Sequence, residues 1–273
     1  MILVKAVILG IVQGLTEFLP ISSSGHLVFF QTLFGMKEPM LAFDIALHAG
    51  TLAAVLVYFH KEILSILADF WKTIGKCFCP CVCVAGGGSF LWFWIVLTLI
   101  PTGLMAIFFK DFVEASFSNL RFVALAWFVM GLFLIASSKL RSGTKNLKEI
   151  GWLRALGIGF MQGLSLMPGI SRSGSTILAG MFFGIQKEDA AKFSFLISIP
   201  AILAAIAMDL KEGLTYFSSH GAEVFLGFVS AALSGYVVIK WLMSVIHKGK
   251  FFLFGYYCLF ISILSFGLTF FLR

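Results

Sequence analysis

The chain has 273 residues, of which 60% are hydrophobic and 12% charged, with a mean hydropathy of +1.01 and a formal net charge of +7. Soluble globular proteins carry about 25% charged residues, so this composition excludes an ordinary soluble domain and predicts an all-α polytopic membrane protein. The positive charge does not indicate nucleic-acid binding, because the lysines and arginines fall mainly between the apolar segments, where membrane orientation requires them.

Ten apolar segments follow one another along the chain, five in each half. We expect helices over residues 2–19, 24–35, 41–60, 90–109 and 119–138, and then over 152–167, 174–185, 190–209, 221–241 and 251–272. The second and seventh segments, of about a dozen residues each, are too short to cross a hydrocarbon layer roughly 30 Å thick. We therefore expect each of them to form a re-entrant helix hairpin with the segment before it.

The two halves contain a duplicated motif. The segment GIVQGLTEFLPISSSGH begins at Gly10, and the segment GFMQGLSLMPGISRSGS begins 149 positions later at Gly159. Eight of the sixteen pairs ending at Gly25 and Gly174 are identical, where about one identity is expected by chance, so this is an internal duplication. Three crossings follow each hairpin, an odd number, which predicts an inverted repeat: residues 1–138 and 150–273 within one transmembrane domain, 1–273.

The distribution of basic residues predicts the orientation of the chain. Thirteen lysines and arginines fall on the face opposite the N-terminus and six on the N-terminal face, with Arg172 left aside as intramembrane. Cytoplasmic loops carry the excess of basic residues. We therefore expect the N-terminus to be extracytoplasmic and the first hairpin to enter from that face.

Each copy of the motif breaks its helix with proline, serine and glycine, at residues 20–25 and 168–174. Unwound backbone at membrane depth is tolerated only where protein or a wet cavity covers it. Each break then opens a new short helix, and a helix N-terminus suits an anion, phosphate above all. We expect the two tips to meet around one ligand. The candidate substrate-binding residues are Gln13, Ser22, Ser24, Gly25, Ser171, Ser173 and Gly174.

Charge appears where the two copies differ. Arg172 corresponds to Ser23 in the first copy, and Glu17 corresponds to Leu166 in the second. A buried guanidinium is costly unless paired, and its planar fork fits phosphate oxygens. A structural ion pair of Arg172 with Glu17 or Asp44, and a packing role for His26, are the alternatives to function. The candidate catalytic residues are Glu17, Ser23, His26 and Arg172.

Asp44, His48 and Thr51 share one face of the third segment. This stripe either supports the site, coordinates a cation, or forms an interhelical hydrogen-bond seam, and we favour the support role. Four of the five cysteines lie within residues 77–83 at alternate positions. That spacing is not typical of a zinc site, so metal binding or lipidation is a minor alternative to a tolerated loop.

The pair of motifs resembles the bacterial undecaprenyl-diphosphatase family, the phosphatases associated with bacitracin resistance. The resemblance rests on QGLTEFLP followed by SSGH in the first half and on PGISRS in the second, and it extends over essentially the whole chain. It implies hydrolysis of undecaprenyl diphosphate to undecaprenyl phosphate and inorganic phosphate, which recycles the lipid carrier of cell-wall synthesis.

The resemblance also implies a site and a setting. The family's motif residues fall on Gln13, Glu17, Ser23, His26 and Arg172. A divalent cation is implied, magnesium or calcium, with Glu17 and Asp44 as candidate ligands here. Gln13 has no carboxylate to offer a metal. The implied location is the bacterial plasma (inner) membrane, with a site that opens to the extracytoplasmic side. The implied partners are the polyprenyl diphosphate and membrane lipids, and a homodimer is possible.

Other functions are compatible with parts of the pattern. Inverted repeats with broken helices are typical of secondary transporters, so a carrier or flippase of a lipid phosphate or small anion is the alternative. The type 2 lipid-phosphate phosphatases share similar short motifs, but Leu178 stands where their nucleophilic histidine should be. The identity of the nucleophile stays open between Ser23, His26 and water.

Overall fold

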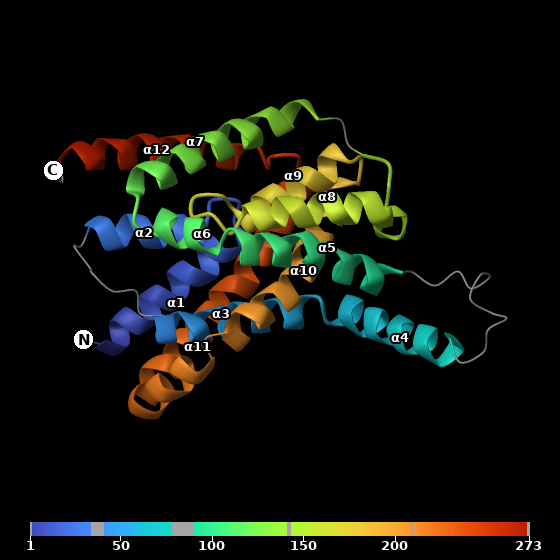
Figure 1. The fold of residues 1–273 in the computed structure, drawn as a ribbon, viewed down its shortest axis with the longest axis horizontal. Coiled ribbons are helices and arrows are strands. Elements are labelled where there is room, and N and C mark those ends of the chain that lie inside the picture. Colours follow the sequence, from blue (N-terminus) through green and yellow to red (C-terminus); the bar gives the residue numbers. More distant parts are fainter. Residues whose placement is uncertain (1, 34–40, 78–89, 141–142, 209, 272–273) are drawn as a thin grey trace.

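The computed structural model describes residues 2–33, 41–77, 90–140, 143–208 and 210–271, and this part of the chain is almost entirely helical (Figure 1). Each of the ten predicted segments corresponds to a helix. These are α1 (Ile2–Phe18), α2 (Ser23–Leu33), α3 (Leu41–Tyr58), α5 (Leu91–Phe108), α7 (Leu120–Ala136), α8 (Gly151–Leu164), α9 (Arg172–Phe182), α10 (Lys187–Met208), α11 (Leu210–His247) and α12 (Leu253–Phe271). The predicted all-α polytopic architecture is confirmed.

Two helices were not predicted. α4 (His60–Cys77) follows α3 directly, and α6 (Lys110–Phe117) links α5 to α7. Neither is apolar throughout, so neither stands out as a hydrophobic segment. α11 also extends beyond its predicted range at both ends, with a kink at His220. Residues 78–89 lie outside the described residues, and they include all of the cysteine-rich stretch 77–83 except Cys77.

Within the described residues, five helical stretches are long and apolar enough to cross a membrane. They are Leu91–Phe108, Leu120–Lys139, Lys187–Ala207, His220–His247 and Leu253–Phe270. α3 and α4, which meet at a bend of 80°, would add a sixth if they formed one broken span. α2 and α9 have 11 residues each, too short to cross, in agreement with the expectation for the short arms of the two hairpins.

Helices from the two halves of the chain pack closely through glycines. α1 lies against α11, α8 lies against α5, and α7 lies against α12. A Cβ atom on Gly14 of α1 would lie 2.6 Å from the carbonyl oxygen of Ala231. A Cβ atom on Gly159 of α8 would lie 2.7 Å from Pro101. Small residues let membrane helices approach in this way.

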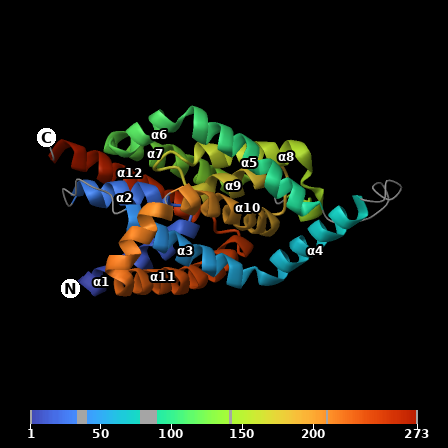
Figure 2. The same ribbon diagram turned by 60° about the horizontal axis from the view of Figure 1, so that its bottom comes forward.

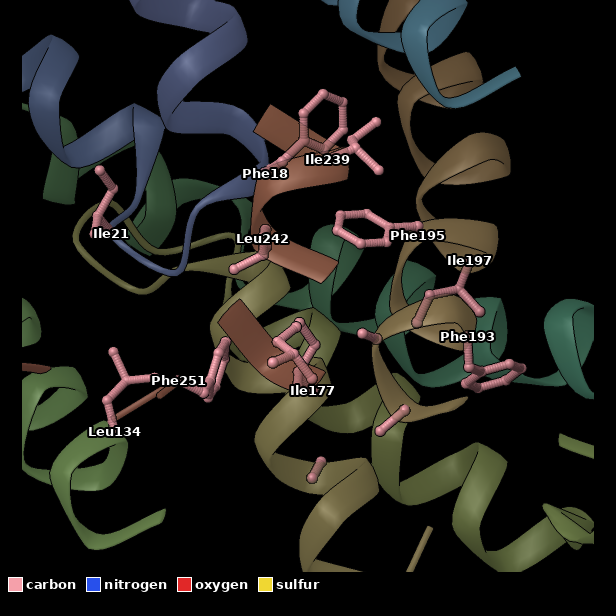
Figure 3. Packing of buried hydrophobic residues seen from close by; sticks show 14 of the residues in the cluster. Phe18, Ile21, Leu134, Ile177, Phe193, Phe195, Ile197, Ile239, Leu242 and Phe251 are labelled. Atoms are coloured by element: carbon pink, nitrogen blue, oxygen red, sulfur yellow. The ribbon is translucent and has the colours of Figure 1, made fainter. Parts of the chain in front are cut away.

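An aromatic cluster fixes the end of α1. The Phe195 ring of α10 packs 5.7 Å from Phe18 and 5.6 Å from Phe59, measured between ring centroids. Figure 3 shows Phe18 and Phe195 beside Ile239 of α11, with Ile21 near the first break. Phe18 is buried and directly follows Glu17. The core therefore holds the last turn of α1, which carries the predicted acid, in a defined place.

Candidate active site

The two helix breaks lie side by side and are hydrogen-bonded to each other. The amide of Gly169 donates to Ser22 Oγ at 3.1 Å, and Ser171 Oγ donates to the carbonyl oxygen of Leu19 at 3.2 Å. Trp127 of α7 donates from its indole nitrogen to the carbonyl oxygen of Ile21 at 2.8 Å. These bonds satisfy polar groups that buried, unwound backbone would otherwise leave unpaired.

Serine caps begin both short helices in the same way. Ser22 Oγ accepts from the amide of Gly25 at 3.2 Å, and Ser171 Oγ accepts from the amide of Gly174 at 3.1 Å. Ser22 has a φ of 65°, which is uncommon for a residue with a side chain. Its position between two N–H donors, those of Gly25 and Gly169, accounts for the conformation.

Several predicted ligand-binding residues therefore have internal partners. The hydroxyls of Ser24 and Ser173 lie 3.2 Å from those of Ser22 and Ser171, respectively. Gly25 and Gly174 are packing positions as well, because a Cβ atom would lie 2.7 Å from Trp127 and 3.1 Å from Pro20, respectively. The geometry gives these residues a part in building the tips, and their contact with substrate stays a prediction.

A polar cluster surrounds the carboxylate of Glu17. Arg172 at the start of α9 forms an ion pair with Glu17 Oε1. Ser23 Oγ and Gln13 Nε2 donate to the other carboxylate oxygen, Oε2, at 2.9 and 3.0 Å. The side chains of Glu17 and Arg172 are 8% and 17% exposed. The other terminal nitrogen of Arg172, Nη1, is buried, and it has no hydrogen-bond partner among the described residues.

His48 of α3 approaches the same cluster. Its Nδ1 donates to the carbonyl oxygen of Asp44 at 2.8 Å, which leaves Nε2 as the acceptor when the ring is neutral. That Nε2 lies 3.4 Å from Gln13 Nε2 and 4.0 Å from Glu17 Oε2. Thr51 Oγ1 donates to the carbonyl oxygen of His48 at 2.9 Å. The stripe on α3 thus reaches the site through His48.

His26 lies in a separate environment. Its Nδ1 donates to the carbonyl oxygen of Ser22 at 2.7 Å, and its Nε2 lies 2.7 Å from the hydroxyl of Tyr257 on α12. The residue is 4% exposed, stacked on Tyr257 and edge-on to Trp127. Among the contacts between described residues, none joins His26 to Glu17 or Arg172. Both ring nitrogens already have partners.

Tyr257 and Trp127 are the members of this region that sequence reasoning missed. Both lie in long apolar helices outside the duplicated motifs. A single tyrosine or tryptophan in such a helix is ordinary, because aromatic residues are common in membrane segments. Only the packing of α7 and α12 against the first hairpin indicates their roles.

The described residues fit a divalent cation only in part. No three His, Cys, Asp or Glu side chains within the described ranges come together as a metal-binding group. Glu17 is engaged by Arg172, Ser23 and Gln13. His48, which lies near Glu17, bonds to the backbone carbonyl oxygen of Asp44 and not to its carboxylate. Magnesium is often held by one or two carboxylates together with substrate phosphates. The donor set suits that arrangement and does not suit an all-protein cage.

Two cavities lie away from this cluster. One, of about 550 Å³, is an apolar groove between α5 and α8 that includes Ile100 and Phe160. Another, of about 350 Å³, includes Thr32 and Arg121. Neither includes Glu17 or Arg172. The convergence of charged and polar groups, rather than cavity size, therefore identifies the candidate site.

Comparison with known proteins identifies the family of this chain. Residues 6–264 match the family described as bacitracin resistance protein BacA. The undecaprenyl-diphosphatase of Methanobrevibacter smithii is 41% identical over 269 residues, covering 97% of this chain and 96% of that protein. That of Methanosphaera stadtmanae is 42% identical, covering 96% of each chain. That of Carboxydothermus hydrogenoformans is 41% identical, covering 93% of this chain and 92% of its own. The chain belongs to the bacitracin resistance protein BacA family.

Proposed function

We propose that this protein hydrolyses undecaprenyl diphosphate to undecaprenyl phosphate and inorganic phosphate, and so recycles the lipid carrier for cell-wall synthesis. The relatives named above carry the name of that activity, and each matches this chain over nearly its whole length. The observation that carries the proposal is the largely buried ion pair between Glu17, in the last turn of α1, and Arg172, the first residue of α9. The unpaired Nη1 of Arg172 offers a donor for a phosphate oxygen.

Arg172 and the start of α9 bind and orient the diphosphate in this proposal. A planar guanidinium donates to two phosphate oxygens, and the helix N-terminus adds positive potential. The incoming diphosphate competes with Glu17 for Arg172. As the guanidinium turns to the phosphate, the Glu17 carboxylate becomes available to accept a proton.

Ser23 is the preferred nucleophile. Its Oγ donates to Glu17 at 2.9 Å, which is the geometry of a hydroxyl beside its general base. Ser23 Oγ attacks the terminal phosphorus as Glu17 takes its proton, and the bond from phosphorus to the bridging oxygen breaks. Undecaprenyl phosphate leaves, and water then hydrolyses the phosphoserine to release phosphate. Direct attack by water activated by Glu17 is the alternative, whereas His26 has both nitrogens engaged.

A divalent cation, magnesium or calcium, would be held by diphosphate oxygens together with Asp44, and by Glu17 as well when Glu17 does not serve as the general base. When bound, it would neutralise charge on the transferring phosphoryl group. Magnesium suits the small number of carboxylates better than calcium, which takes six to eight oxygen ligands.

The setting follows from the charges and the packing. We place the chain in the bacterial plasma membrane with its N-terminus and active site on the extracytoplasmic side, because the lysine-rich ends of the helices mark the opposite face. The inverted repeat is supported by exchanged partners: α1 packs on α11, while its counterpart α8 packs on α5, the counterpart of α11. A homodimer stays a prediction.

Phosphate release from undecaprenyl diphosphate by the purified protein tests the proposal. We expect release by the wild type, loss in Arg172→Ala, and loss with a chelator that added magnesium reverses. Movement of intact substrate across liposomes without phosphate release would instead establish a transporter. A folded wild-type protein that releases no phosphate under any of these metal conditions would refute the proposed function.

A further inference from the structure

Helix α4 has two distinct faces. Lys61, Ser65 and Lys72 lie along one side of the helix at intervals of four and seven residues. The apolar residues lie on the other side and form two adjacent rows. The inner row is Ile63, Ile66 and Phe70, and the outer row is Leu64, Leu67, Trp71 and Ile74.

The inner row packs on the protein. Ile63 and Ile66 contact the main hydrophobic core, and the Phe70 ring lies 5.2 Å from that of Trp92, between centroids. This row therefore has a partner and accounts for the attachment of α4 to the bundle.

The described part of the chain leaves the outer row largely uncovered. Leu64, Leu67, Trp71 and Ile74 are 63%, 48%, 68% and 40% exposed. They form one continuous apolar strip along the helix, because their spacing of three and four residues keeps them on one face. An apolar strip of this kind marks an interaction surface rather than a scattered surface feature.

The contact of α4 with the start of α5 indicates that the membrane surface covers the strip. Trp92, which Phe70 contacts, is the second residue of the membrane span Leu91–Phe108. α4 therefore touches a span at its end, where the hydrocarbon layer meets the headgroups. The helix turns by 80° from α3, and both views show it diverging from the bundle (Figures 1 and 2).

We propose that α4 is an interfacial membrane helix whose outer row enters the boundary between headgroups and acyl chains. Lys61 and Lys72, on the opposite face, then point toward lipid phosphates and water. Amphipathic helices with aliphatic and tryptophan residues on one face and lysines on the other bind lipid surfaces in this way. α4 would thus fix the depth and tilt of α3 and α5, the two helices that it joins.

Two single-cysteine variants test the proposal in the full-length protein. Leu67→Cys places a polarity-sensitive NBD probe on the outer row, and Ser65→Cys places it on the polar face at nearly the same height. Both are made in a chain whose five native cysteines, Cys77, Cys79, Cys81, Cys83 and Cys258, are replaced by alanine. The protein is reconstituted in vesicles of phosphatidylcholine and phosphatidylglycerol, and its thermal unfolding checks that it is folded.

We expect the probe at position 67 to show blue-shifted emission, quenching by lipids with a nitroxide near the headgroup, and loss of quenching by aqueous iodide. The probe at position 65 should show the reverse. Equal iodide quenching at both positions would place α4 in water and overturn the proposal. The proposal would also be overturned if a nitroxide at the end of the lipid acyl chain quenched the probe at position 67 most strongly, because that result indicates a membrane-spanning helix. The probe at position 67 could also be shielded from both iodide and lipid nitroxides. If that shielding disappears when the protein is diluted with lipid, a second copy covers the strip and the proposal is wrong.

Discussion

Ser23 and Arg172 occupy equivalent positions of the duplicated motif, and both contact the same carboxylate. Ser23 donates to Glu17 Oε2 at 2.9 Å, while Arg172 pairs with Oε1. The duplication thus brings two related helix starts together, and the divergence at one position supplies a hydroxyl from one copy and a cation from the other. A site with distinct chemical roles arises from a nearly symmetric scaffold.

Arg172→Lys should lower kcat/KM at least tenfold, although the charge is kept. A lysine presents a point charge and cannot donate from a planar fork to Glu17 and phosphate together. Hydrogen bonds to charged groups contribute about 1.5–3 kcal/mol, which corresponds to roughly 10- to 150-fold in rate. Phosphate release measured against substrate concentration checks this, with Arg121→Lys as the exposed control. Near-normal turnover in Arg172→Lys would contradict the assignment.

Ser23→Ala should reduce turnover by a factor on the order of 10² or more, because the variant loses the hydroxyl held against its general base. Ser118→Ala, an exposed position with only a local hydrogen bond, serves as the control. Rapid quenching of the wild type followed by mass spectrometry should reveal phosphate on Ser23. Substantial activity in Ser23→Ala would instead favour water as the nucleophile.

Much of the fold could be predicted, because an apolar segment with few or no charged residues marks every main helix. The meeting of the two breaks could also be predicted, since each break is unwound backbone that must be covered and opens a helix N-terminus suited to the same anion. Both arguments depend on the high cost of unsatisfied polar groups in lipid. The ion pair of Glu17 with Arg172 is the contact that the sequence analysis offered as the structural alternative to a catalytic role, and the functional role of Arg172 stays a prediction.

What could not be predicted depends on packing between distant helices. α4 lacks a long apolar run, because its polar residues alternate with apolar ones at helical spacing. The placement of His26 also required the structure. Proximity in sequence to Ser23 suggested a shared cavity, but the two side chains have different partners. Ser23 contacts Glu17, whereas His26 meets Tyr257, 231 positions away.

Tyr257→Phe should lower both stability and activity, because it removes the hydroxyl that contacts His26. Tyr256→Phe should change little, because the Tyr256 ring packs on Phe252, a contact that phenylalanine keeps. Removing the hydroxyl leaves the buried Nε2 of His26 without a partner, at a cost of about 1–3 kcal/mol. Thermal unfolding and phosphate release should be measured for Tyr257→Phe, His26→Ala and the double variant. If Tyr257 acts by positioning His26, the double variant should be no worse in turnover than His26→Ala. Additive losses would contradict that coupling.

Gly14→Ala should destabilise the protein, whereas Gly103→Ala should not. A Cβ atom on Gly14 would lie 2.6 Å from the carbonyl oxygen of Ala231 and 2.7 Å from the amide nitrogen of Gly235, so α1 and α11 would have to separate. Overpacking of this kind costs about 1–3 kcal/mol. Gly103 of α5 has open space around it, and alanine there should be neutral or stabilising by up to about 1 kcal/mol, because it favours the helix. Thermal unfolding of both variants in one detergent measures the difference. Because α1 carries Glu17, Gly14→Ala should also reduce phosphate release, and equal stability of the two variants would show that the close contact of α1 with α11 is not required.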